Sequence, residues 1–349
     1  MIDVGLILAR LLHYAAVTTL AGVSFFPLYA YQGIEPQTLA CWRRRLLLAA
    51  AVVALLSGLF WFVFAVANMS GSLADLTDPE VVWAVVRDTG FGGVWTARLL
   101  LAVIIGGVTA MNLFWTRTVN QDLIMSVLAA ALLASLAGAG HSQIEEGWAS
   151  VVHVASDAAH LLAAGAWLGG LAPLGFILLR YSTTSREAPV DVGRVLLRFS
   201  GMGYVAVATL IGSGLINSWL LVGSVSGLLE TPYGQILLGK LAMFAGMLAL
   251  AATNRFWLVP SMSKPRTDGS GESTAWTGRL RNHVLGEQFL GLMILLAVSV
   301  LGTMRPAAGQ YWMGCETKKG GFEHMSEDMQ TCIDERPLLT QTCVRRRSG

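Results

Sequence analysis

The chain has 349 residues, of which 54% are hydrophobic and only 13% carry a charged side chain, with a formal net charge of +2. An average soluble domain carries roughly 25% charged residues, so this composition excludes a soluble globular protein and indicates an integral membrane protein. The basic residues are spread over separate connectors and form no long run, so nucleic-acid binding is not expected.

Eight apolar segments follow one another along the chain. A helix needs about 20 residues to cross the roughly 30 Å of bilayer hydrocarbon. We expect membrane-spanning helices at about 4–31, 46–67, 94–115, 122–140, 151–179, 195–222, 233–256 and 284–304. The first segment contains Asp3, with neither a basic residue ahead of it nor a small-residue cleavage pattern, so we expect a retained helix rather than a signal peptide. The predicted fold is all-α, a polytopic bundle of eight transmembrane helices that forms a membrane domain at 1–306.

Positive charges fall in every second connector between these segments. They are Arg43, Arg44 and Arg45, then Arg117, then Arg180, Arg186, Arg194 and Arg198, and finally Arg255, Lys264, Arg266, Arg279 and Arg281. Cytoplasmic loops carry the excess of Lys and Arg in membrane proteins. We therefore expect both chain termini on the periplasmic side. No internal repeat is apparent from the sequence alone.

Residues 307–349 are polar, and we expect them to form a periplasmic tail. The tail contains Cys315, Cys332 and Cys343, so two of the three could form a disulfide in an oxidising compartment. One interpretation of the tail is a soft-metal capture site built from His324, Met325 and Met329. The other is an irregular segment without a binding role.

Several ionisable residues lie inside the predicted helices, where their cost makes them candidates for function. Arg10 and His13 are three residues apart on the first helix and share one face. His153, Asp157 and His160 share one face of the fifth helix. At 1.5 Å of rise per residue, His13 and His160 both lie roughly 14 Å below the outer surface, with Arg10 and Asp157 at roughly 9 Å.

These histidines and the aspartate predict a path for a metal cation that opens outward, with His141 at the outer end of the fourth helix. Neutral imidazole suits copper and zinc, and thioether sulfur selects Cu(I). Met243 and Met247 could supply sulfur at comparable depth, although core packing is the simpler explanation of both. A structural ion pair is the alternative explanation of Arg10 and Asp157.

Two histidines at equal depth on different helices also fit the axial ligation of haem b. In that alternative, His13 and His160 bind the iron, while Arg10, Arg98 and Lys240 pair with the propionates. The protein would then be a membrane redox protein.

Other polar and aromatic residues have supporting roles in these interpretations. Trp167 and Trp219 would wall the path, and Asn217 and Asn254 would form hydrogen bonds between helices. Glu287 would either pair with a loop cation or form part of an exit.

Five short motifs, in this order, resemble the copper-resistance protein D family (CopD, PcoD). They are RLLH at 10–13, HVASDAAHLLAAGAWLGGL at 153–171, GLINSWLLVG at 214–223, YGQILLGKL at 233–241 and LGTMRP at 301–306. The resemblance covers about 1–306, and the motif at 153–171 is its most specific part. It implies a bacterial inner-membrane protein that handles copper, often with a separate periplasmic partner of the CopC type.

The resemblance and the histidines and aspartate inside the helices together favour transport of copper, with Cu(I) preferred, from periplasm to cytoplasm. The chain has no nucleotide-binding motif, which argues against an ATP-driven pump. The haem-binding redox protein, linked to quinol or to copper reduction, remains the alternative.

Overall fold

The computed structural model describes residues 2–31, 35–112, 119–137, 148–181, 192–222, 224–258 and 271–306. Within these ranges the chain is helical and contains no strand. The long helices are α1 (Ile2–Ala30), α2 (Gln37–Ser70), α4 (Gly90–Met111), α5 (Val119–Ala134), α6 (Trp148–Ala164), α7 (Leu171–Tyr181), α8 (Val192–Val222), α10 (Pro232–Thr253) and α12 (Gly271–Leu301). Two π-helical turns, η4 (Gly165–Gly169) and η5 (Asn254–Leu258), continue α6 and α10.

Seven helical segments in the described ranges are long and apolar enough to cross a bilayer. They are Ile2–Ala30, Gln37–Ser70, Gly90–Met111, Ser150–Arg180, Val192–Val222, Pro232–Leu258 and Gly278–Leu301. The expected all-α, multi-pass bundle is therefore confirmed. The helix expected at 122–140 is represented by α5, an apolar helix shorter than a full span. The count of eight and the periplasmic position of both termini stay predictions.

The second span begins earlier than expected. We predicted a start near residue 46, but α2 begins at Gln37, so Arg43 lies on the helix rather than in a connector. Its guanidinium donates to Glu35 Oε1 and to Asp122 Oδ1, both at 3.0 Å, and the residue is only 3% exposed. Because two carboxylates neutralise and satisfy this guanidinium, it can be buried where α2 meets α5.

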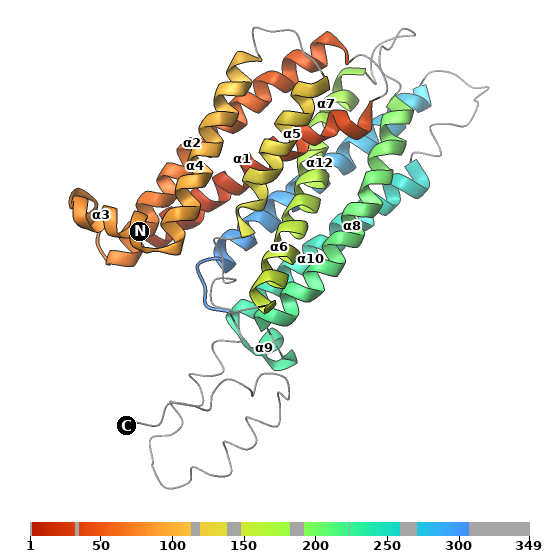
Figure 1. Cartoon of the computed structure of the whole chain (residues 1–349). Coiled ribbons are helices and arrows are strands. Elements are labelled where there is room, and N and C mark those ends of the chain that lie inside the picture. Colours follow the sequence, from red (N-terminus) through yellow and green to blue (C-terminus); the bar gives the residue numbers. More distant parts are fainter. Residues whose placement is uncertain are drawn as a thin grey trace, which may run out of the picture.

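The central helix of the bundle is α1, which contacts α2, α5, α12 and η4 (Figure 1). Its approach to η4 is the tightest. A Cβ on Gly22 would overlap the backbone of Gly169, and a Cβ on Gly169 would overlap the carbonyl oxygen of Thr18. Glycine at both positions lets the two backbones touch, which is how small residues bring helices together in membranes.

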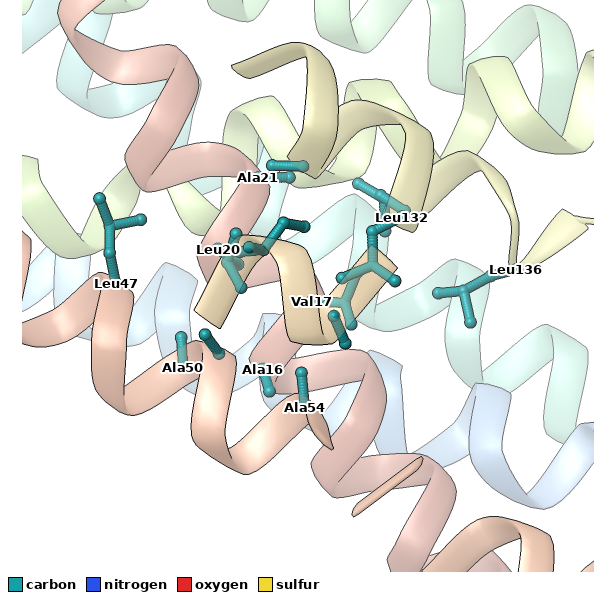
Figure 2. Packing of buried hydrophobic residues seen from close by; sticks show 14 of the residues in the cluster. Ala16, Val17, Leu20, Ala21, Leu47, Ala50, Ala54, Leu132 and Leu136 are labelled. Carbon is teal, nitrogen blue, oxygen red and sulfur yellow. The ribbon is translucent and has the colours of Figure 1, made fainter. Parts of the chain in front are cut away.

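Buried apolar side chains form two large clusters, one in each half of the chain. The first joins α1, α2, α4 and α5, and Figure 2 shows Val17 and Leu20 of α1 close to Ala54 of α2 and Leu132 of α5. The second joins η4, α7, α8, α10 and α12 with the end of α1.

Two short helices lie at the same end of the bundle as the start of α1 (Figure 1). One is α3 (Pro79–Asp88), which follows the 3-10 turn η1 (Ala74–Thr77), and the other is α9 (Val225–Glu230). They precede α4 and α10 respectively. This end is the one predicted to face the periplasm.

Candidate functional site

His13 is held by α2 through one ring nitrogen. Its Nδ1 lies 3.0 Å from the carbonyl oxygen of Ala54 and 3.2 Å from Ser57 Oγ. A carbonyl can only accept, so Nδ1 carries the proton and Nε2 carries the lone pair. His13 is 1% exposed, and its Nε2 has no hydrogen-bond partner among the described residues. The ring therefore presents a buried lone pair of the kind that binds a metal ion.

Trp61 is the centre of a cationic cluster around His13. Its ring centroid lies 5.5 Å from that of His13, while the guanidinium carbons of Arg10 and Arg98 lie 5.3 and 5.2 Å from the same centroid. Both distances suit cation–π attraction. Arg98 also donates from Nε to Ser135 Oγ at 3.1 Å and from Nη2 to the Ser135 carbonyl at 2.8 Å.

His160 is held in the same way by α8. Its Nδ1 lies 2.9 Å from Ser213 Oγ, whose hydroxyl donates to the carbonyl of Thr209 at 2.5 Å. Because the Ser213 proton is used in that bond, the hydroxyl accepts from His160 Nδ1, which leaves the lone pair on Nε2. His160 is half-buried.

Asp157 lies one turn before His160 and belongs to the same cluster. Its Oδ1 accepts from Asn217 Nδ2 at 3.2 Å, so Asn217 forms an interhelical hydrogen bond as expected. Asp157 also interacts electrostatically with His153 and Lys240. The ion pair expected as an alternative between Arg10 and Asp157 is not formed, since neither residue takes part in a described salt bridge.

Glu287 forms a third polar cluster, towards the other end of the bundle. Its Oε2 accepts from Trp167 Nε1 at 3.3 Å and its Oε1 accepts from Asn254 Nδ2 at 2.7 Å. Arg10 lies close to Gly302, near the end of α12. Glu287 is therefore roughly 22 Å along α12 from the level of Arg10.

A cavity of about 180 Å³ opens beside Glu287. Its lining includes Trp167, Phe199, Tyr204, Asn254 and Glu287. Trp167 lies on η4 and Asn254 on η5, so both π-helical turns direct a polar side chain to this carboxylate. Such π-bulges occur frequently at functional sites. The cavity and the carboxylate together make this cluster a candidate for the inner end of a path.

The structure does not bring all the expected residues together. Trp219 is 74% exposed on α8, so it faces outward and does not wall a path. Met247 is 4% exposed and packs in the second apolar cluster, as the core-packing explanation predicts, and Met243 is half-buried. His141, His324, Met325 and Met329 lie outside the described residues.

Within the described ranges, no group of three or more His, Cys, Asp or Glu residues is placed to hold a metal ion. The reason is that α2 holds His13, whereas α8 holds His160 and Asp157. Each histidine thus stands in its own helix pair.

Comparison with known proteins assigns both halves of the chain to one family. Residues 1–152 match "Copper resistance protein D-like, N-terminal domain", and residues 193–301 match "Copper resistance protein D". The chain is 31% identical over 302 residues to copper resistance protein D of Pseudomonas syringae pv. tomato, which covers 86% of this chain and 96% of that protein. The chain belongs to the copper resistance protein D family.

Two further relatives agree with this assignment. The inner membrane protein YebZ of Escherichia coli (strain K12) is 29% identical over 297 residues, covering 85% of this chain and 97% of YebZ. The copper transport protein CutJ of Bacillus subtilis (strain 168) is 28% identical over 252 residues, covering 70% of this chain and 44% of CutJ. No solved structure matches the chain. This member of the copper resistance protein D family is a multi-pass inner-membrane protein with a copper-related function.

Four residues of these polar clusters were not predicted from the sequence. Ser57 and Ser213 bond to the two histidines. Trp61 contacts the guanidinium groups of Arg10 and Arg98, and Ser135 bonds to Arg98. One signal was available: each clamping serine is followed by a glycine, at 58 and 214, inside an otherwise apolar helix. Glycine at these two positions leaves room for the histidine ring to approach the helix closely.

Proposed function

We propose that this protein moves copper ions across the inner membrane, from the periplasm towards the cytoplasm. The observation that carries the proposal is the pair of histidine clamps. Each ring is fixed through Nδ1 to a serine of the neighbouring helix, which leaves the Nε2 lone pair available to a ligand. Imidazole suits copper, and the relatives named for copper resistance and copper transport favour copper over zinc.

The proposed route starts at His153 and Asp157, with His141 as a further ligand at the entrance. It continues past His160 and His13 and leaves beside Glu287, whose carboxylate lies at the wall of the cavity. Cu(I) is the favoured ion because it tolerates coordination by two ligands. The described residues offer separate ligand positions of one or two residues each, and no larger cluster.

Copper flux into proteoliposomes tests this proposal. We expect the His13→Ala and His160→Ala variants each to reduce the initial rate at least tenfold, because each removes a station that no neighbouring donor can replace. Trp219→Phe is the matched control, since Trp219 faces outward and should leave the rate unchanged. Wild-type flux in both histidine variants would refute the proposal. Loading the vesicles from one side and then the other determines the direction.

A separate periplasmic copper carrier of the CopC type would deliver the ion to the entrance. We place this contact at the end of the bundle that carries α3 and α9, next to the start of α1 (Figure 1). Copper transfer from the loaded carrier to the purified protein should be faster than dissociation of copper from the carrier into a chelator. Equal rates would argue against direct delivery.

Haem b binding is the second candidate function, and one observation favours it. Arg10 and Arg98 both have guanidinium nitrogens that are buried without a partner among the described residues, next to the free Nε2 of His13. Those donors fit the propionates, and Nε2 of His13 and of His160 fits axial ligation. A bound haem would supply one-electron transfer. An absorption spectrum of the purified protein, oxidised and reduced, decides: a Soret band lost in His13→Ala and His160→Ala would replace transport with redox function.

A further inference from the structure

The two halves of the membrane domain repeat the same helix start. The Thr89 hydroxyl accepts from the N–H of Gly92 at 3.0 Å at the beginning of α4, and the Thr231 hydroxyl accepts from the N–H of Gly234 at 3.0 Å at the beginning of α10. A short helix, α3 or α9, precedes each cap. At both glycines an added Cβ would overlap carbonyl oxygens of that short helix.

Arg98 and Lys240 follow these two threonine caps at the same spacing. They therefore occupy equivalent positions on α4 and α10. The first half places its basic residue next to His13 and Trp61, and the second half places its own next to Asp157 and His160.

The histidine clamps repeat as well. Ser57 and Ser213 each bond to a histidine Nδ1 and each donate to the carbonyl four residues earlier on their own helix. The glycine after each serine faces the same atom of the ring: a Cβ there would lie 3.4 Å from His13 Cε1 in the first half and 3.7 Å from His160 Cε1 in the second. The repeat thus extends over α1 with α2 and over α6 with α8.

One pair of equivalent positions differs in charge. The residue one turn after the clamping serine touches the residue one turn before the histidine in both halves. In the second half Asn217 bonds to Asp157, whereas in the first half Trp61 stacks with Arg10. Where the second half has a carboxylate opposite Lys240, the first half has a second cation beside Arg98.

The unsatisfied atoms of the two halves show the same contrast. Around Trp61, besides the acceptor Nε2 of His13, four donors are buried without a partner among the described residues: Arg10 Nε and Nη1, Arg98 Nη1 and Trp61 Nε1. In the second half Asn217 Oδ1, an acceptor, is left without a described partner.

Arg98 is buried and Arg10 is half-buried, and neither takes part in a described salt bridge. The phenol of Tyr14 interacts electrostatically with both guanidinium groups, but a neutral phenol supplies no charge. Cations removed from water without a counter-charge are strongly unfavourable, so the first half requires a negative charge that its described residues do not supply.

We propose that the first half binds a small monovalent anionic group between Arg10 and Arg98, against Trp61 and His13. The group takes the place that the Asp157 carboxylate has in the second half. It is either a free inorganic anion such as chloride or a carboxylate of a bound cofactor, such as a haem propionate. By neutralising the two cations it would also let the lone pair of His13 meet a copper ion, but the proposal does not depend on copper transport.

Binding of radioactive chloride to the full chain in lipid nanodiscs tests this site by equilibrium dialysis. We expect one saturable chloride per chain, and at least a tenfold loss of affinity in Arg10→Gln and Arg98→Gln. Arg98→Lys keeps the charge and should retain binding with reduced affinity, which separates loss of the site from loss of the fold. Arg87→Gln is the matched control, because Arg87 also stacks on a tryptophan, Trp83, at 4.4 Å but on the exposed surface.

The remaining outcomes are also informative. If the wild-type protein retains haem instead of binding chloride, and Arg98→Gln loses that haem, the site is supported and the anionic group is a propionate. Chloride binding that is equal in wild type and Arg98→Gln would overturn the proposal. So would the absence of both ligands.

Discussion

Single hydroxyl groups determine which nitrogen each histidine can offer. In a membrane helix a serine normally donates to its own backbone, as Ser57 and Ser213 do. Its oxygen then still accepts from a second donor. That second donor is a histidine Nδ1 in both halves, and in the first half the carbonyl of Ala54 accepts from the same nitrogen. The tautomer and the direction of each ring therefore follow from acceptors on one neighbouring helix.

Replacing Ser213 by alanine should weaken copper binding without removing the ligand. The His160 ring would lose the acceptor that holds Nδ1–H, and changes of this kind typically cost 10- to 100-fold in metal affinity. Competition with a Cu(I) chelator measures the effect. Ser299→Ala is the control, because among the described residues the Ser299 side chain bonds to the carbonyl of Leu295 on its own helix and to no other helix. Equal affinities in the two variants would show that the clamp does not orient His160.

Arg43 shows what a paired buried cation looks like in the same molecule. Both of its carboxylate partners are supplied by the chain, whereas the guanidinium groups of Arg10 and Arg98 have no such partner among the described residues. This contrast explains why Arg10 and Arg98, but not Arg43, require an added ligand.

Arg43→Ala should destabilise the protein by about 3–5 kcal/mol, because it leaves Glu35 and Asp122 without their shared cation. Thermal unfolding in detergent would show the change as a lower midpoint. Arg45→Ala, an exposed position two residues later, should have little effect. A similar midpoint shift in both variants would mean that the ion pairs contribute little.

At the scale of the helices, two irregular turns adapt the bundle to its polar residues. The sequence predicts continuous spans at 151–179 and 233–256, and the structure interrupts both with a π-helical turn. Each turn carries a residue that bonds to Glu287. Periodicity alone could not place these turns, because a π-bulge changes the helical register by one residue without changing the apolar composition.

The crossing of α1 and η4 should tolerate no added methyl group. Gly169→Ala puts a Cβ against the carbonyl of Thr18, and overpacking of this kind costs about 1–3 kcal/mol. Thermal unfolding measures the loss. Gly201→Ala, where a Cβ would meet nothing within 4 Å, should be neutral or stabilise by up to about 1 kcal/mol through helix propensity. Equal stability of the two variants would show that α1 and η4 can separate.

At the scale of the whole molecule, the distribution of Lys and Arg predicts that the last span ends on the periplasmic side. Alkaline phosphatase fused after Pro306 should therefore be active, and a green fluorescent protein fused there should be dark. The reverse pattern would mean either that the number of spans is odd or that the whole topology is inverted. Truncation after Pro306 tests the tail: if 307–349 is an irregular segment without a binding role, its removal should leave copper flux unchanged.

The class of the fold and the helix face that each polar residue shares follow from the sequence alone. Length and apolarity identify the spans because hydrocarbon thickness sets how many residues a helix needs to cross it. The spacing of Arg10 with His13 and of Asp157 with His160 places each pair on one face because every helix has the same 3.6-residue turn. The family assignment followed from motifs in the expected order and was confirmed.

Only the tertiary structure decided which helix faces which, and therefore what each polar residue touches. It placed His13 and His160 in two different serine clamps, turned Trp219 outward and left Arg10 beside Trp61 rather than in an ion pair with Asp157. It also revealed the repeat of the two halves, which is not apparent from the sequence alone. The physical reason is that the repeated elements are contacts between helices far apart in sequence, while most lipid-facing positions require only apolar side chains and can diverge freely.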